Sequence, residues 1–168
     1  LQMVVRDRNR IALQSDLLGA AALGVKNLLC LSGDHQKFGD DPRAKNVFDI
    51  DSIQLVPLVM TMRDDGVFPS GGAVEGAPQF DIGSAINPLA EPFDIRVPRF
   101  KLKREAGADF VQTQCIYNMD KCKRFMEEAK KEGLHERTKI LAGVTPLKSA
   151  GMAKFMNRMV AGIEITAE

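Results

Sequence analysis

Short apolar runs alternate along the chain with longer stretches in which apolar residues recur at helical spacing. The run at 27–31, Asn-Leu-Leu-Cys-Leu, is continuously apolar, which is typical of a strand buried on both faces. Similar runs predict four more strands at 2–5, 80–85, 110–116 and 139–142. Helical patterns are predicted at 9–24, 51–64, 119–132 and 149–159, and one more begins near Pro92 or Pro98 and ends near 107. Pro57 predicts a kink or a late start in the helix at 51–64.

Strand and helix alternate five times with no hairpin signal, which predicts a parallel α/β sheet, either a barrel or an open doubly wound sheet. No GxGxxG follows a strand and no GxxxxGK[ST] occurs, which disfavours an open dinucleotide-binding fold and nucleotide hydrolysis. Five βα units cannot close an eight-stranded barrel. A barrel interpretation therefore predicts that strands are missing from this chain, which opens inside an apolar run.

Composition narrows the function only a little. Hydrophobic residues make up 45% of the chain and charged residues 27%, and the net charge is +1, so nothing favours nucleic acid or a membrane as a partner. The three cysteines lack metal-site spacing, and Cys30 and Cys115 each lie in an apolar run, which predicts buried thiols. This pattern fits a protein of the reducing cytoplasm.

Polar residues follow the predicted strands, where parallel α/β folds place their chemistry. Asp34 follows Gly33 at the end of a buried strand, and it is either a turn residue or a carboxylate that binds a polar heterocycle. Gln114 ends the fourth strand, and it is either an exposed amide or the contact of an amide-rich ligand such as a pterin. Arg99 and Lys103 share one helix face, which is either solvated or a phosphate site.

Five stretches together resemble the methylenetetrahydrofolate reductase family. The stretch at 6–20 resembles the third βα unit, Ser32-Gly33-Asp34 with its strand resembles the fourth strand and flavin loop, and 48–52 resembles the start of the fourth helix. The stretches at 106–114 and 143–147 resemble the sixth strand and the mouth of the seventh. The forms at 85–88 and 114–120 look most like the branch found in anaerobes and in fused homocysteine methyltransferase–reductase proteins.

The resemblance implies a partial (βα)8 TIM barrel over residues 1–168, as a single incomplete domain with FAD across the carboxyl ends of the strands. It implies that NAD(P)H or another donor reduces the flavin, which reduces methylenetetrahydrofolate to methyltetrahydrofolate. A homo-oligomer or an electron-transfer partner subunit is compatible with it. Two alternatives stay open, namely a flavin-free pterin-binding methyltransferase barrel and a non-catalytic scaffold part of a larger complex.

The resemblance also implies a set of site residues. Asp34 matches the carboxylate near flavin and folate and is the expected catalytic residue, and Gln114 matches the folate-contacting amide. The expected FAD-binding residues are Gln2, Ser32, Gly33, Asp34, Phe48, Asp49, Asn87, Arg99 and Lys103. Gly83 stands where the family has a Tyr, and Arg96 and Arg99 replace an Asp and an Asn. We expect the family's catalytic Glu to lie on a first strand outside this chain.

We therefore expect these 168 residues to be inactive and poorly folded when expressed alone. The expectation is that the inner faces of the strands lose the layers of side chains that normally fill a barrel. The free energy lost with that burial would exceed the usual stability of a domain, which is about 5–15 kcal/mol. We expect the inner-face positions to include Val4, Leu29, Val111 and Leu141.

Overall fold

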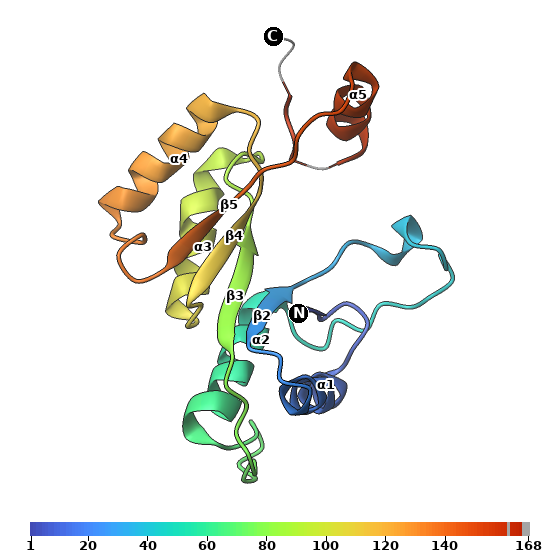
Figure 1. The fold of residues 1–168 in the computed structure, drawn as a ribbon, viewed down its shortest axis with the longest axis vertical. Coiled ribbons are helices and arrows are strands. Elements are labelled where there is room, and N and C mark those ends of the chain that lie inside the picture. Colours follow the sequence, from blue (N-terminus) through green and yellow to red (C-terminus); the bar gives the residue numbers. More distant parts are fainter. Residues whose placement is uncertain (161, 166–168) are drawn as a thin grey trace. The chain divides into compact units, whose positions relative to one another are not determined.

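The computed structural model describes residues 1–160 and 162–165 and contains five strands that alternate with helices (Figure 1). The strands are β1 (Gln2–Val4), β2 (Asn27–Leu31), β3 (Asp81–Ile86), β4 (Phe110–Cys115) and β5 (Lys139–Gly143). The α-helices are α1 (Arg10–Ala22), α2 (Ser52–Met60), α3 (Arg96–Glu105), α4 (Met119–Lys131) and α5 (Ala150–Met159). Short helical turns add η1 (Gln36–Phe38), η2 (Thr61–Asp65) and η3 (Phe93–Ile95).

The strands form one sheet in the order β1-β2-β3-β4-β5, with parallel pairing. This order confirms the predicted α/β fold class, in which consecutive strands are neighbours as in part of a (βα)8 barrel. The chain divides into two compact units, which are described separately below. Unit 1 comprises residues 1–84 and 106–108, and unit 2 comprises residues 85–105 and 109 onward.

In unit 1, α1 and α2 supply apolar side chains to a core against one face of the strands. Met3, Cys30 and Ile82 point to this core, where Leu13 of α1 and Leu55 of α2 are fully buried. The register pairs Gln2 with Leu29 and Leu29 with Gly83, so these three residues form one layer on the opposite face. Val4 and Leu31 form the next layer of that face, toward the carboxyl ends.

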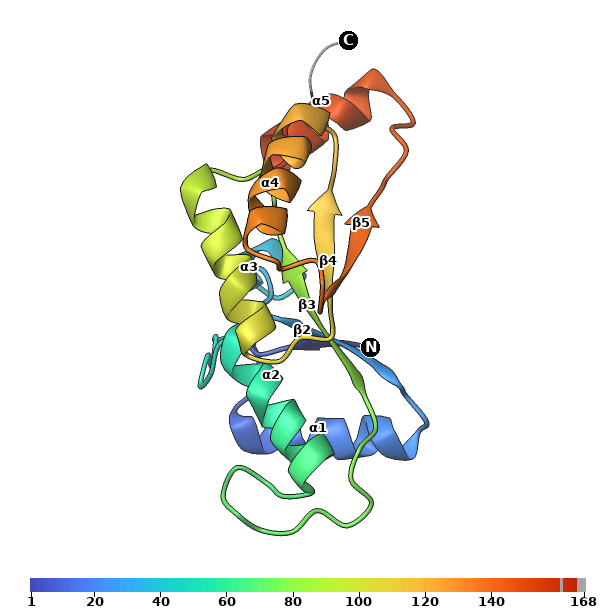
Figure 2. The same ribbon diagram turned by 90° about the vertical axis from the view of Figure 1, so that its left-hand side faces the viewer.

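In unit 2, α3 and α4 pack on one face of β4 and β5 (Figure 2). Phe100 of α3 and Phe125 of α4 are stacked with ring centroids 6.2 Å apart. Val111 is fully buried against these rings, so its assignment to the inner face was wrong. Strand side chains alternate between faces, and the residue that faces the other way is the exposed Gln112, paired in register with Leu141. Leu141 is 50% exposed on that face, as expected for an inner-face residue of a sheet that is not closed into a barrel.

Local signals explain where the helices begin. Asn9, Asn118 and Ser149 cap α1, α4 and α5 through their side chains, and Asp51 forms a capping box with Gln54 at the start of α2. Because α2 begins at Ser52, the late start predicted from Pro57 does not occur, and the helix instead continues into the π-helical turn η2. Within residues 1–160 and 162–165, no helix combines the length and apolar content that crossing a membrane requires.

Candidate functional site

The Ser32-Gly33-Asp34 loop leaves the carboxyl end of β2 in a tight turn over β1. Gly33 has a φ of 85°, and a Cβ atom at this position would collide with Cγ1 of Val4. The Oγ of Ser32 lies 3.0 Å from the Oγ of Ser52, which joins the loop to the first residue of α2. The Asp34 side chain is exposed, as a ligand-facing carboxylate must be.

Arg6 fixes the position of this loop. Its guanidinium donates to the backbone carbonyl of Asp34 at 2.5 Å and forms a two-pronged pair with Asp7, at 2.7 Å for each hydrogen bond. The Arg6 guanidinium lowers the pKa of Asp7, and the hydrogen bond to Asp7 raises the pKa of Arg6, helped by the nearby charge of Asp34. The sequence placed Arg6 within the stretch 6–20 that resembles the family, but it did not predict a role for this residue.

The other two arginines of the Arg-Asp-Arg-Asn-Arg stretch bind other segments of unit 1. Arg8 pairs with Asp16 of α1 at 2.5 Å. Arg10 pairs with Asp49 through its Nε at 2.8 Å and its Nη2 at 3.0 Å, and its backbone N–H donates to the same carboxylate at 2.9 Å. These hydrogen bonds lower the pKa of Asp49 to about 2.

The predicted flavin contacts Phe48 and Asp49 differ in what they offer a ligand. Phe48 has a φ of 43°, a conformation that non-glycine residues seldom adopt, and the residue is 47% exposed. Val47 donates to the backbone carbonyl of Arg6 at 2.7 Å and so holds the segment in place. The Asp49 carboxylate is already bound by Arg10 and joins the start of α1 to the segment before α2.

Gln2 lies at the amino-terminal end of β1 and not at its carboxyl end. Its partners across the sheet are Leu29 and, one strand further, Gly83. Gln2 therefore lies one layer below Val4 and Leu31 on the face opposite the helices.

In unit 2, Gln114 lies in an irregularity at the carboxyl end of β4. Gln112 pairs with Leu141 and Cys115 pairs with Gly143, so β4 advances three residues where β5 advances two. This extra residue is a β-bulge, a feature that redirects side chains near active sites. The Oε1 of Gln114 accepts from the backbone N–H of Cys115 at 3.1 Å. The amide NH₂ of Gln114 is therefore the group that faces away from its own backbone.

A second set of contacts joins the carboxyl end of β4 to the segment that follows β5. The Sγ of Cys115 lies 3.0 Å from the Oγ1 of Thr145, and the hydroxyl of Tyr117 donates to the backbone carbonyl of Thr145 at 2.8 Å. Tyr117 also approaches the Sδ of Met156 on α5 at 3.8 Å. Cys115 is only half-buried, in contrast to the buried thiol that was predicted, whereas Cys30 is fully buried as predicted.

Lys103 and Arg99 share a side of α3 but differ in exposure. Lys103 is buried, with only 8% of its surface exposed. Its Nζ donates to the backbone carbonyl of Ala85 near the carboxyl end of β3. Arg99 is exposed. Arg96 donates instead to the backbone carbonyls of Ala90, Glu91 and Pro92, at 2.9, 2.6 and 3.2 Å, and so braces the loop between β3 and α3.

Asn87 has a local structural role at the end of β3. Its Oδ1 accepts from the backbone N–H of Leu89 at 3.1 Å, which forms an Asx-type turn. Gly162 packs against the Asn87 amide so closely that a Cβ atom would collide with it. Nearby, the Nζ of Lys121 bridges Glu91 at 3.1 Å and Glu164 at 2.7 Å. The loop and the segment 162–165 are thus held together.

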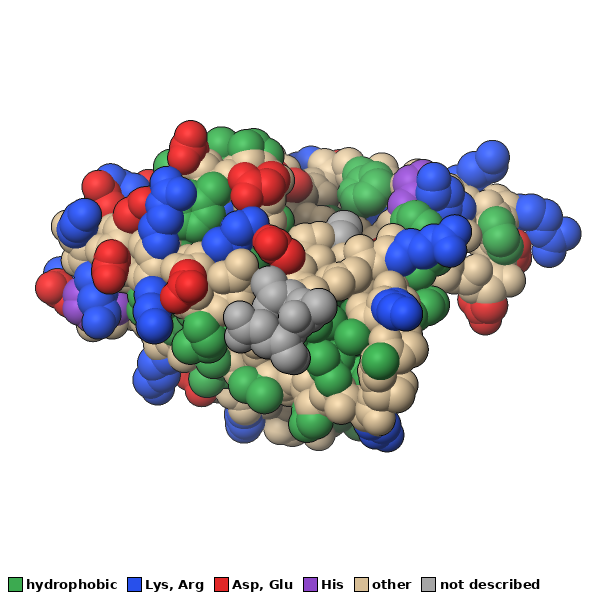
Figure 3. All heavy atoms as spheres, turned by 90° about the horizontal axis from the view of Figure 1, so that it is seen from above, with side chains coloured by type: hydrophobic (Ala, Val, Ile, Leu, Met, Phe, Trp, Pro, Cys, Tyr) green, Lys and Arg blue, Asp and Glu red, His purple; other side chains and the backbone are tan. Residues whose placement is uncertain are grey.

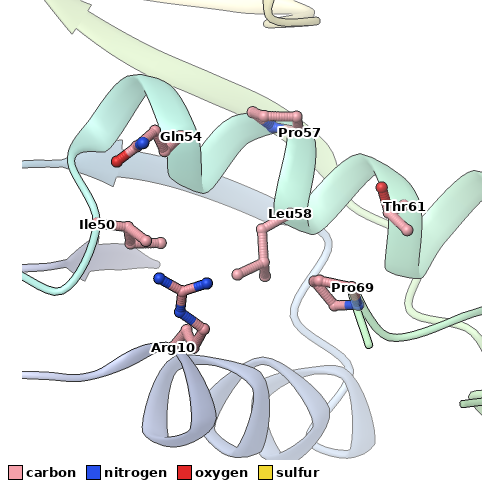
Figure 4. A pocket seen from close by; sticks show the side chains of 7 residues that line it. All are labelled: Arg10, Ile50, Gln54, Pro57, Leu58, Thr61 and Pro69. Carbon is pink, nitrogen blue, oxygen red and sulfur yellow. The ribbon is translucent and has the colours of Figure 1, made fainter. Parts of the chain in front are cut away.

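A pocket lies between α1 and α2, beside the Arg10–Asp49 pair (Figure 4). Its volume is about 300 Å³, and its lining is mostly apolar, with Ile50, Pro57, Leu58 and Pro69 around the guanidinium of Arg10. Because Arg10 is paired with Asp49, the pocket offers little unbalanced charge. Among the described residues, His, Cys, Asp and Glu side chains nowhere gather in a group of three suited to a metal ion.

The structure therefore places the predicted residues in two groups. Unit 1 brings Ser32, Gly33 and Asp34 together with Arg6 and the segment that carries Phe48, and unit 2 contains Gln114 and Lys103 at the carboxyl ends of β4 and β3. In the left part of Figure 3, basic and acidic side chains are interspersed. These features define a parallel α/β barrel-type protein with polar strand ends.

The chain belongs to the methylenetetrahydrofolate reductase family, whose model matches residues 1–168. Among solved structures, the chain is similar to one described as an uncharacterized protein from Clostridium thermocellum that binds two copies of 5-methyl-5,6,7,8-tetrahydrofolic acid. The TM-score is 0.56 at 16% sequence identity, and the match covers 99% of this chain and 49% of that one, about half its length. At this identity the likeness shows the fold. No curated protein matches the chain.

Proposed function

We propose that this chain forms part of a flavin-dependent reductase that converts 5,10-methylenetetrahydrofolate to 5-methyltetrahydrofolate. The observation that carries the proposal is the family match over all 168 residues. The solved relative is described as binding 5-methyltetrahydrofolic acid, which is the product of this reaction, and this supports a folate ligand. The polar residues that follow β2 and β4 supply the kind of groups that a pterin needs.

The residues present fit a flavin. Gly33 lets the Ser32–Asp34 loop turn tightly over Val4, and all three residues of the loop are exposed to a ligand at the carboxyl end of β2. Lys103 brings a mostly buried positive charge to the carboxyl end of β3, where it would attract a diphosphate. When bound, FAD would supply the hydride transfer, with NAD(P)H or another donor as reductant. The family resemblance assigns flavin contacts to Ser32, Gly33, Asp34 and Phe48 in unit 1 and, separately, to Arg99 and Lys103 in unit 2.

Asp34 and Gln114 would act on the folate. The Asp34 carboxylate is exposed, and its negative charge would favour the cationic folate intermediate by Coulomb attraction. Because the Oε1 of Gln114 is bound to the Cys115 N–H, Gln114 would offer the substrate its NH₂ donors. The two residues would thus stabilise positive charge and fix the orientation of the pterin, respectively.

The test uses the whole purified protein that contains this chain. We expect it to show the visible absorption of an oxidised flavin and to lose that colour when 5-methyltetrahydrofolate is added, because the reverse reaction reduces the flavin. Asp34→Asn should keep the flavin but slow bleaching by about tenfold or more, since it removes a charge beside the reacting ring. A colourless protein that binds 5-methyltetrahydrofolate would instead favour a flavin-free barrel, and no folate binding would refute the proposal.

A further inference from the structure

The hydroxyl of Thr113 makes two hydrogen bonds at the β-bulge at the end of β4. The Oγ1 of Thr113 accepts from the backbone N–H of Gly143 at 2.9 Å and donates to the backbone carbonyl of Gln114 at 2.8 Å. Thr113 is itself 6% exposed, so both bonds form in a nearly dry environment. In a regular ladder the Gly143 N–H would bond to a carbonyl of β4, and here the hydroxyl takes that place.

Gly143 completes this arrangement from β5. A Cβ atom at Gly143 would lie 2.6 Å from the backbone oxygen of Thr113 and 3.2 Å from the nitrogen of Cys115. The two strands therefore approach more closely here than a residue with a side chain at position 143 would allow. The tight contact and the two hydroxyl bonds fix the extra residue of β4 between Gln112 and Cys115.

We propose that Thr113 is a positioning residue for substrate binding, because its hydroxyl holds the bulge that directs the Gln114 amide toward the folate. This inference rests on the proposed function, in which Gln114 contacts the substrate. Side chains of a strand alternate between two faces, so a bulge that slips by one residue would turn Gln114 toward the other face. The direction of an amide that touches the ligand would then depend on a hydroxyl that does not touch it.

The experiment compares Thr113→Val with Thr113→Ser in the whole protein. Valine keeps the shape of threonine but removes the hydroxyl, and serine keeps the hydroxyl but removes the methyl group. We expect Thr113→Val to weaken the binding of 5-methyltetrahydrofolate, measured by calorimetry, by about tenfold or more, because both hydrogen bonds that hold the bulge are lost and Gln114 is no longer directed to the ligand. Thr113→Ser should stay within about threefold of wild type, and flavin content should be unchanged in both variants.

Thr138→Val is the matched control. Thr138 is also a buried threonine of unit 2, at 3% exposure, and its hydroxyl has no hydrogen-bond partner among the described residues. The same chemical change there should leave folate binding unaltered. If Thr113→Val does not fold, Thr113→Ala serves the same purpose, because it also removes the hydroxyl, and Thr113→Ser reports the effect of losing the methyl group by itself.

The outcomes separate this inference from the proposed function. If the wild-type protein does not bind 5-methyltetrahydrofolate, the proposed function fails and this inference fails with it. If the wild type binds but the hydroxyl-free variants bind equally well, only the positioning role of Thr113 is refuted. Equal weakening in Thr113→Val and Thr113→Ser would also refute it, because the methyl group rather than the hydroxyl would then be responsible. Loss with valine and rescue by serine would support it.

Discussion

The Arg6 guanidinium donates a 2.5 Å hydrogen bond to the backbone carbonyl of Asp34, 28 residues further along the chain. The same arginine accepts a bond from Val47 through its own carbonyl, so one residue joins three loops of unit 1. The bidentate pair with Asp7 holds the guanidinium in the required plane. The direction of the Asp34 carboxylate therefore depends on a residue outside the Ser-Gly-Asp sequence.

Replacing Arg6 should loosen the loop that carries Asp34. Arg6→Lys keeps the charge, but an ammonium cannot pair with both Asp7 oxygens and reach the Asp34 carbonyl at the same time. We expect faster amide hydrogen exchange over residues 32–36 in Arg6→Lys than in wild type. Arg8→Lys is the control, because Arg8 binds Asp16 on α1 and not this loop. Equal exchange in the two variants would refute the role of Arg6.

Gly33→Ala should destabilise unit 1. An alanine with a φ of 85° is strained by about 1–2 kcal/mol, and its Cβ atom would also collide with Val4. We expect a lower midpoint in chemical denaturation and partial recovery in the double variant Gly33→Ala with Val4→Ala. The second change removes the collision but not the backbone strain. A double variant no more stable than the added effects of the two single changes predict would contradict this account.

The Arg10–Asp49 pair should make stability depend on acid pH. Arg10 lowers the pKa of Asp49 from 3.8 to about 2 in the folded state, so the ionised pair stabilises the fold above pH 3.8. That contribution is lost as the pH falls toward 2, because Asp49 becomes protonated. We expect Asp49→Asn to be less stable than wild type at neutral pH, with a difference that shrinks between about pH 4 and pH 2. A difference that stays constant over that range would exclude the ion pair as its cause.

Lys103 should matter for both stability and flavin binding. Lys103→Met keeps an unbranched side chain but removes the donor to the Ala85 carbonyl, which should cost about 1–3 kcal/mol in the free energy of unfolding. If Lys103 binds the flavin diphosphate, the same variant should also raise the dissociation constant of FAD about tenfold or more. Lys101→Met is the control on the same helix, where the lysine is half-exposed and paired with Glu132 at 3.0 Å. Fluorescence titration and urea denaturation measure the two effects separately.

The order of elements could be predicted from the sequence because the spacing of apolar residues differs strongly between strands and helices. β2 was predicted with its observed bounds, and α1 lies within the predicted range 9–24, with Asn9 as its N-cap and Gly24 in the left-handed conformation just after its end. The start of α3 at Arg96 lies between the two proline positions that were considered, because Pro98 is tolerated in the first turn of a helix. Such local signals are carried by neighbouring residues, which a single sequence shows directly.

Contacts between distant segments could not be predicted in this way. The burial of Lys103 and the link from Arg6 to Asp34 depend on which strands become neighbours. The error at Val111 has a related origin, because an apolar residue was assumed to fill the barrel while the helices bury it. The alternation of Gln112 and Gln114 with Val111 and Thr113 was visible in the sequence, and it indicates a polar inner face at β4. The bulge itself leaves no obvious mark in the sequence.

The three arginines at positions 6, 8 and 10 do not make this stretch a site of net positive charge. Three basic residues within five would ordinarily suggest affinity for phosphate, yet each is matched by its own aspartate, at 7, 16 and 49. An approaching anion therefore meets almost no uncompensated positive charge from them. Exposed pairs of this kind weaken as salt screens them. Ionic strength, rather than the charge of a ligand, is the variable to which this part of the chain should respond.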